Sequence, residues 1–167
     1  MENSQESFQE KAKEYFDEKK YRTIIVGKDG YKSADDLKDA IDAVGEDNLS
    51  SEEREEILRH LKASNPKKEM LKAIDATKSN EKKAKLIAAC WEIDMDCTDD
   101  FLFFVQLCCS DDFNVSLEAL TVIENIDNAV KPEELSKARE LVANAIKQQP
   151  ENADLLADLL KIIKGKQ

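Results

Sequence analysis

The chain has 167 residues, of which 41% are hydrophobic and 37% are charged. Its 25 Lys and Arg stand against 36 Asp and Glu, which gives a net charge of −11 at pH 7. The hydrophobic share excludes general disorder, and the length suits one single-core domain or a short repeat array. The acidity argues against sequence-independent binding of nucleic acid, which needs an excess of phosphate-neutralising cations.

The sequence carries no signal for membrane insertion or export. It contains no run of about 18 apolar residues, so we expect no membrane span. Its first seven residues, Met-Glu-Asn-Ser-Gln-Glu-Ser, are polar, unlike a secretory signal. The cysteines form no CxxC pair, so we interpret them as reduced core residues of a cytoplasmic protein, with a metal or redox site as the less favoured alternative. They are Cys90, Cys97, Cys108 and Cys109. We predict no cofactor.

Apolar residues recur at helical spacing along most of the chain, and no glycine occurs between Gly45 and Gly165. Because tight β-turns usually need glycine, this stretch predicts helices joined by short polar loops. The predicted helices cover about residues 4–22, 33–45, 66–78, 80–94, 99–110, 113–128, 132–148 and 152–164, and one more begins at residue 50.

The segment 23–32 interrupts this helical pattern. Its triplet Ile24-Ile25-Val26 fits either a short strand or an apolar loop, and we favour the loop. The following Gly27-Lys28-Asp29-Gly30 is a weak match to a phosphate-binding turn, because it lacks the spacing of a P-loop and the Ser or Thr after the lysine.

The second part of the chain reads as helix pairs whose second members recur roughly every 32 to 36 residues. The segments Leu86-Ile-Ala-Ala-Cys-Trp-Glu92 and Ser116-Leu-Glu-Ala-Leu-Thr-Val-Ile-Glu124 flank an apolar helix at 101–109. This pattern, over residues 50–165, resembles the HEAT/armadillo-like α-solenoids, in particular small uncharacterised bacterial members of that class.

The resemblance implies an all-α fold of antiparallel helix pairs, stacked as a short right-handed α-solenoid in which each pair buries one face on the next. Residues 50–167 then form the HEAT-like repeats, and residues 1–49 form an N-terminal helical region that caps them in one compact unit. A tetratricopeptide-like topology is the runner-up, because Ala138, Val142 and Ala145 with Pro150 match the second helix of that repeat.

The acidity is concentrated in one block. Residues 86–130 contain ten acids and no Lys or Arg, whereas the rest of the chain has 26 acids and 25 bases. The ten acids are Glu92, Asp94, Asp96, Asp99, Asp100, Asp111, Asp112, Glu118, Glu124 and Asp127.

Three interpretations of this block compete. The favoured one is helix-end capping by the Asp99-Asp100 and Asp111-Asp112 pairs. The second is a recognition surface for a basic partner, with Glu92 and Glu124 at equivalent places of successive repeats. The third is a divalent-cation site at Asp94, Asp96, Asp99 and Asp100. It is disfavoured because a calcium loop needs glycine where Asp99 stands and glutamate where Val105 stands.

The sequence offers no set of catalytic groups. The only histidine, His60, lies beside an apolar stripe and is expected at the edge of the core, and the only tryptophan, Trp91, is either a core anchor or a binding hot spot. We therefore predict a non-enzymatic protein–protein interaction or scaffold module. It would be a monomer or a weak homo-oligomer that binds a protein or peptide of basic character. The candidate binding residues are Trp91, Glu92, Asp94, Asp96, Asp99, Asp100, Asp111, Asp112 and Glu124. The alternative is an α-solenoid enzyme of the HEAT-like DNA glycosylase type, which the acidity disfavours.

Overall fold

The computed structural model describes residues 26–27, 30–31 and 33–166. Within this part of the chain nearly all regular structure is helical, which confirms the all-α prediction. The α-helices are α2 (Ala34–Val44), α3 (Ser51–Ala63), α4 (Lys67–Ala76), α5 (Asn80–Glu92), α6 (Phe101–Cys108), α7 (Phe113–Glu124), α8 (Pro132–Gln148) and α9 (Ala153–Gly165). Two 3-10 helices, η1 (Thr98–Asp100) and η2 (Pro150–Asn152), precede α6 and α9. The predicted helix at 4–22 lies outside the described residues.

Part of the predicted linker forms an antiparallel ladder, which pairs β1 (Val26–Gly27) with β2 (Gly30–Tyr31). The loop prediction is therefore wrong at these four residues. The cause is tertiary, because the backbone N–H of Tyr31 donates a 2.7 Å hydrogen bond to Ser64 Oγ at the end of α3. The weak phosphate-binding motif falls partly on residues 28–29, which lie outside the described residues.

Polar side chains begin several helices as the sequence predicts. Ser50 and Glu53 form a reciprocal capping box at the start of α3. In this box Ser50 N–H donates to Glu53 Oε2 at 2.8 Å, and Glu53 N–H donates to Ser50 Oγ at 3.2 Å. At the start of α7, Asp112 Oδ1 accepts a 3.0 Å hydrogen bond from Val115 N–H. These bonds satisfy backbone donors that a helix start otherwise leaves unpaired.

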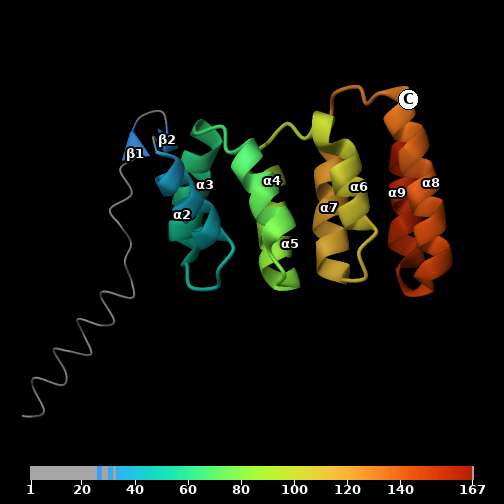
Figure 1. Ribbon diagram of the computed structural model, residues 1–167, viewed down its shortest axis with the longest axis horizontal. Coiled ribbons are helices and arrows are strands. Elements are labelled where there is room, and N and C mark those ends of the chain that lie inside the picture. Colours follow the sequence, from blue (N-terminus) through green and yellow to red (C-terminus); the bar gives the residue numbers. More distant parts are fainter. Residues whose placement is uncertain (1–25, 28–29, 32, 167) are drawn as a thin grey trace, which may run out of the picture.

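The helices lie side by side in a row of four pairs (Figure 1), α2 with α3, α4 with α5, α6 with α7 and α8 with α9. Contacts also connect successive pairs, since α2 packs on α4, α5 on α7, α6 on α8 and α7 on α9. Each pair therefore buries part of its apolar surface against its neighbour in the chain.

The core runs through all four pairs. Helix α6 is the most apolar element, and only Gln106 on it is exposed, because α7 and α8 both pack against it. The largest fully buried side chains are Ile41, Leu61, Met70, Ile74, Leu86, Ile87, Phe101, Phe104, Ile123, Leu156, Leu159 and Ile163. Over the described ranges, no helix combines the length and the apolar character that crossing a membrane requires.

Candidate functional site

Two of the predicted binding acids form ion pairs with cations of α3. Glu92, the last residue of α5, is held by both ends of the Arg54 guanidinium, at 2.9 Å to Oε1 and 2.7 Å to Oε2. Asp94, two residues further on, pairs with Lys62. The sequence block is free of bases, but the preceding helix pair supplies them in space.

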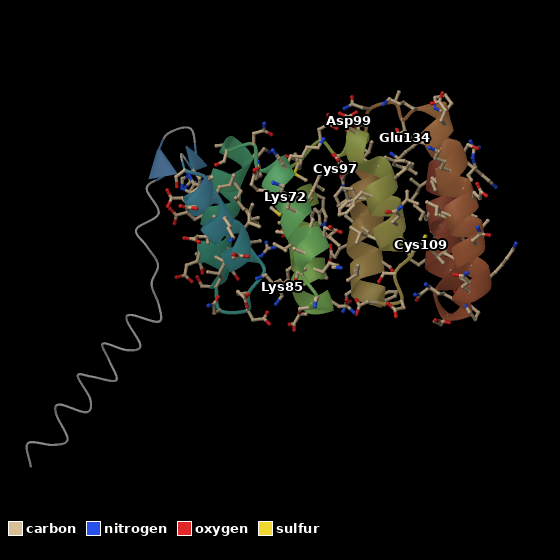
Figure 2. The ribbon with its side chains drawn as sticks, in the orientation of Figure 1. Lys72, Lys85, Cys97, Asp99, Cys109 and Glu134 are labelled. Atoms are coloured by element: carbon tan, nitrogen blue, oxygen red, sulfur yellow. The ribbon has the colours of Figure 1, made fainter. Side chains whose placement is uncertain are left out.

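A third acid of the block is neutralised in the same way. Asp100 Oδ2 lies 2.8 Å from the Lys67 ammonium at the start of α4, and Asp100 makes no capping hydrogen bond to α6. The capping interpretation is therefore correct for Asp112 and wrong for Asp100. Asp99 is exposed, and Figure 2 places it toward the end of the helices opposite Lys85.

Asp96 is held in the loop after α5 by neutral donors. Its Oδ1 accepts from Thr98 Oγ1 at 2.6 Å and from Thr98 N–H at 3.0 Å, and its Oδ2 accepts from Asn128 Nδ2 at 3.3 Å. The hydrogen bonds from Thr98, with a smaller contribution from Asn128, hold the pKa of Asp96 below its ordinary value. Asp96 therefore stays ionised at neutral pH and is fixed in position.

A hollow of about 340 Å³ lies beside the C-terminal ends of α5 and α7. It is lined by Trp91, Asp94, Met95, Asp96, Cys97, Val122, Asn125, Ile126, Asp127 and Asn128. No Lys or Arg of the described part of the chain is among these residues. The hollow therefore combines three carboxylates with an indole ring and aliphatic and thioether side chains. We call it the acidic hollow.

The backbone that ends α5 carries Asp94 in an unusual conformation. Its φ is +52°, a left-handed value that usually belongs to glycine at a helix end. Met95 N–H donates to the Cys90 carbonyl at 3.0 Å and Asp94 N–H to the Trp91 carbonyl at 3.1 Å, which is the Schellman pattern. The chain thus places a carboxylate where the backbone favours glycine.

Trp91 is anchored at one wall of the acidic hollow. It is half-buried, and its indole N–H donates a 2.9 Å hydrogen bond to Glu118 Oε2 of α7. This bond fixes the ring between α5 and α7. The ring packs against the core, as the core-anchor interpretation expects, and it also borders the hollow. Its role as a binding hot spot stays a prediction.

A second hollow, of about 350 Å³, adjoins the first and shares Asp94, Met95 and Asp96 with it. Lys62 and Lys67 line this second hollow, so its far side is basic. The loop between α5 and η1 therefore separates a cation-lined hollow from the acidic hollow.

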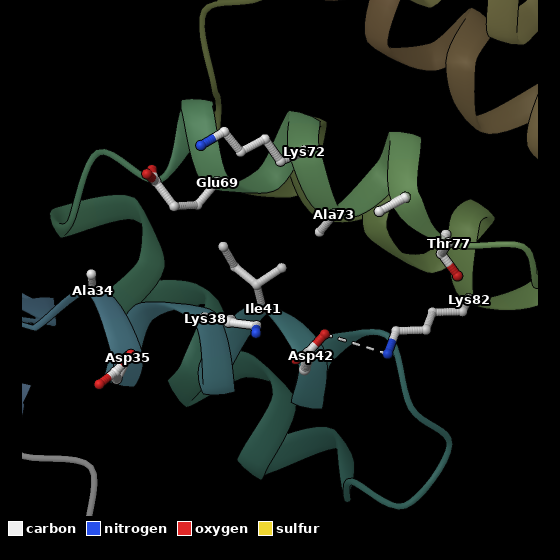
Figure 3. Close-up of a pocket in the computed structure, with 11 residues that line it drawn as sticks. Ala34, Asp35, Lys38, Ile41, Asp42, Glu69, Lys72, Ala73, Thr77 and Lys82 are labelled. Carbon is white, nitrogen blue, oxygen red and sulfur yellow. Dashed lines mark hydrogen bonds and ion pairs between the residues drawn. The ribbon is translucent and has the colours of Figure 1, made fainter.

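A larger hollow, of about 530 Å³, lies between α2 and α4 (Figure 3). Ile41 points from α2 toward α4 across its floor, and Lys82 pairs with Asp42 at 3.5 Å on its rim. Three lysines and three acids line it, so its charges are balanced. None of the predicted binding residues borders this hollow.

The structure brings together three of the predicted binding residues, Trp91, Asp94 and Asp96, and leaves the others apart. Asp111 and Asp112 lie at the start of α7, and Glu124 is exposed at its end. Sequence reasoning missed Asp127 and Met95 as members of the hollow. A signal for Asp127 existed, because Ile126-Asp127 repeats the dipeptide Ile93-Asp94 one helix pair later.

The cysteines are free thiols, and the histidine packs against a tyrosine ring. All four cysteines are free; burial raises the pKa of Cys97 to about 12 and also raises the pKa of the half-buried Cys109. His60 is half-buried and packs edge-on against Tyr31, with ring centroids 6.1 Å apart. Across the described residues, no group of three or more His, Cys, Asp or Glu side chains is arranged to hold a metal ion.

Comparisons of the chain with protein-family models, with curated protein sequences and with solved structures found no match. The resemblance to HEAT-like repeats therefore remains a prediction from the sequence pattern.

Proposed function

We propose that the chain is a non-enzymatic protein-interaction module that binds a basic side chain of a partner protein in the acidic hollow. One observation carries this proposal: Asp94, Asp96 and Asp127 line the same hollow as Trp91. A Lys or Arg side chain that entered would meet carboxylates at its charged end and an aromatic ring beside it. Cation–π contacts of this kind contribute about 0.5–2 kcal/mol.

The helix ends add to the attraction for a cation. The residues that line the hollow lie in the last turns of α5 and α7 or just after them, where the helix dipole places partial negative charge. Each such end favours a nearby cation by about 0.3–1 kcal/mol. An anionic ligand such as a phosphate would be repelled by the same groups.

The chain's own Lys166 supports this expectation. Its ammonium donates a hydrogen bond to the carbonyl of Ile126, one of the residues that line the hollow. Partial burial lowers the pKa of Lys166, while the carboxylates of Asp127 and Glu124 act in the opposite direction. Desolvation outweighs the attraction in the case of Lys166, so what this contact adds is that a carbonyl at the end of α7 accepts a hydrogen bond from an ammonium group.

The ion pair between Lys62 and Asp94 does not block a partner. The side chains of both residues are more than half exposed, at 55% and 76%. Exposed pairs of this kind contribute about 0–1 kcal/mol, so a better-placed cation can replace Lys62.

We further propose that the scaffold is a short right-handed helical-repeat solenoid of the HEAT-like kind. Polar contacts between successive helix pairs support this, because several join residues 32 or 33 positions apart. They are Lys62 with Asp94, Asp96 with Asn128, and Lys67 with Asp100. Other contacts between neighbouring pairs span 36 to 42 residues, so the offset of 32 or 33 recurs at one end of the helices and is not constant.

The state of the cysteines supports a non-enzymatic role in a reducing compartment, which we propose is the cytoplasm. Burial raises the pKa of Cys90 and Cys108 well above the ordinary thiol value, so both are protonated at neutral pH. A protonated and buried thiol is a poor nucleophile.

Because Trp91 is the only tryptophan, its fluorescence reports directly on the hollow. We expect tetra-arginine to change that fluorescence saturably, whereas tetra-citrulline, which has the same shape without the charge, leaves it unchanged. Asp127→Asn should weaken tetra-arginine binding at least fivefold. The matched control is Asp75→Asn, which makes the same charge change at an exposed position of α4 outside the hollow. Equal responses to the two peptides, or equal effects of the two variants, would contradict the proposal.

A further inference from the structure

Helix α7 exposes two large apolar side chains that its own packing does not require. In the described part of the chain three large hydrophobic residues are exposed, Phe113 at 57%, Leu117 at 40% and Leu141 at 37%. The first two are four residues apart on α7, so they lie on one face in successive turns. Leu141 lies on α8.

This face continues along the whole of α7. Residues 113, 117, 121 and 124 follow helical spacing, and none of them is buried. Thr121 Oγ1 donates a 3.1 Å hydrogen bond to the Leu117 carbonyl within the helix, so its hydroxyl needs no outside partner. We call Phe113, Leu117 and Thr121 the α7 stripe.

The α7 stripe faces away from the neighbouring helices. The buried residues of α7 lie on its other faces, where α5, α6 and α9 pack. Glu118, which binds Trp91, points toward α5, and Val122 and Ile126 line the acidic hollow. The α7 stripe and the acidic hollow are therefore separate surfaces. The stripe runs along the exposed face of α7, and the hollow lies at the C-terminal end of the same helix.

Acidic residues stand at both ends of the stripe. Asp111 precedes Phe113 and Glu124 ends the helix, and both side chains are exposed. Helix α7 itself contains no Lys or Arg. From residue 111 to residue 124 the surface is about 20 Å long at 1.5 Å per residue, which is the length of a partner helix of about 13 residues.

We propose that the α7 stripe is the docking surface for an amphipathic, basic helix of a partner protein. Apolar side chains of that helix, spaced i and i+4, pack on Phe113 and Leu117, and Lys or Arg residues near its two ends pair with Asp111 and Glu124. The inference rests on the proposed function in that the chain binds a basic partner, and it adds a second contact and a secondary structure for that partner.

Two synthetic peptides test this inference with the full chain. One is an 18-residue Lys/Leu/Ala helix with a single apolar face, and the other has the same composition in an order that gives no such face. Isothermal titration should detect binding of the first peptide and at least tenfold weaker binding of the second. Similar affinities, or no binding of either, would overturn the inference.

Variants at the stripe complete the test. The double variant Phe113→Ser with Leu117→Ser should weaken binding of the amphipathic peptide at least tenfold. Leu117→Ser alone should still weaken it several-fold, whereas Leu141→Ser, which removes a leucine of similar exposure on α8, should change it less than twofold. Asp111→Lys with Glu124→Lys should also weaken binding, and circular dichroism should confirm that each variant is folded. Unchanged binding by either double variant overturns the inference.

Two further outcomes separate the possibilities. If Asp127→Asn weakens peptide binding and the stripe variants do not, the proposed function stands and this inference is overturned. If the stripe variants weaken binding and Asp127→Asn does not, the docking surface on α7 stands and the proposed role of the acidic hollow is overturned. If sedimentation finds a wild-type dimer that the stripe variants convert to monomer, the occupant of the stripe is a second copy of the chain, and the inference is also overturned.

Discussion

The indole N–H of Trp91 donates a 2.9 Å hydrogen bond to Glu118 Oε2, and this bond connects α5 to α7 at the wall of the acidic hollow. Replacing Trp91 by Phe keeps an aromatic ring and removes the donor. We expect Trp91→Phe to lower the free energy of unfolding by about 1 kcal/mol, because the partly buried Glu118 loses its partner. Urea unfolding monitored by circular dichroism measures this.

A substitution of the acceptor residue, Glu118, serves as the control for Trp91→Phe. Glu118→Gln retains an acceptor oxygen for the indole N–H, so its effect on unfolding should be clearly smaller than that of Trp91→Phe. An equal loss of stability in both variants would mean that the hydrogen bond does not explain the result.

Asp94 occupies a backbone conformation that favours glycine, so two substitutions that both remove its carboxylate should weaken binding alike and differ in stability. Asp94→Gly and Asp94→Ala both remove the carboxylate, but only alanine is strained at a φ of +52°. We expect the glycine variant to be more stable than the alanine variant by about 1 kcal/mol in thermal or urea unfolding. Both variants should bind tetra-arginine more weakly than the wild type. If the alanine variant is as stable as the glycine variant, the left-handed conformation is not maintained.

The ion pair between Arg54 and Glu92 should contribute more than the other surface pairs. Both side chains are about one quarter exposed and the contact is bidentate, whereas the Lys161–Asp158 pair is 77% and 60% exposed. A double-mutant cycle should give a coupling of about 0.5–1 kcal/mol for the first pair and close to zero for the second. Equal couplings would contradict the importance of this contact between α3 and α5.

Alkaline pH should destabilise the fold, because it ionises a buried tyrosine hydroxyl and a buried cysteine thiol. Burial, followed by the carboxylates of Glu56 and Asp36, raises the pKa of Tyr31 from 10.0 to about 12. A group whose pKa is raised by folding stabilises fully below its unfolded pKa, and that stability is lost as pH rises through the folded value. The free energy of unfolding should therefore fall between pH 10 and pH 12.

The contribution of Tyr31 is isolated by Tyr31→Phe, which cannot ionise. Its unfolding free energy should fall less steeply than that of the wild type between pH 10 and pH 12. The unfolding free energy of Cys97→Ser should likewise fall less steeply than that of the wild type from about pH 9 upward, because burial raises the pKa of Cys97 from 9.0 to about 12. Parallel pH curves for wild type and both variants would contradict this account.

Local sequence signals predicted the helices well. Apolar periodicity and the caps at Ser50 and Asp112 give helix boundaries within a few residues of those observed, because these signals act within one or two turns. The ladder at Val26–Gly27 and Gly30–Tyr31 was missed, because it depends on contact with α3 and not on local propensity. A Cβ at Gly30 would lie 2.7 Å from the His60 carbonyl, which only the folded arrangement reveals.

The candidate site was only partly predictable. Trp91, Asp94 and Asp96 stood out because they are close in sequence and lie in a block without bases. The block did not indicate that Arg54, Lys62 and Lys67 neutralise three of its acids, since those cations come from the preceding helix pair, 32 to 38 residues earlier. The contribution of Asp127 likewise depends on how α7 packs beside α5.

The central claim is that the acidic hollow binds a cationic side chain, and the single indole N–H resonance of Trp91 offers the most direct measurement. In a ¹⁵N-labelled sample titrated with tetra-arginine, we expect this resonance and the amides of Asp96 and Asp127 to shift together and saturate with one dissociation constant. We expect the amide of Asp75, an exposed residue of α4 outside both proposed surfaces, to stay in place. A Trp91 resonance that does not move, or that moves equally with tetra-citrulline, would contradict the account.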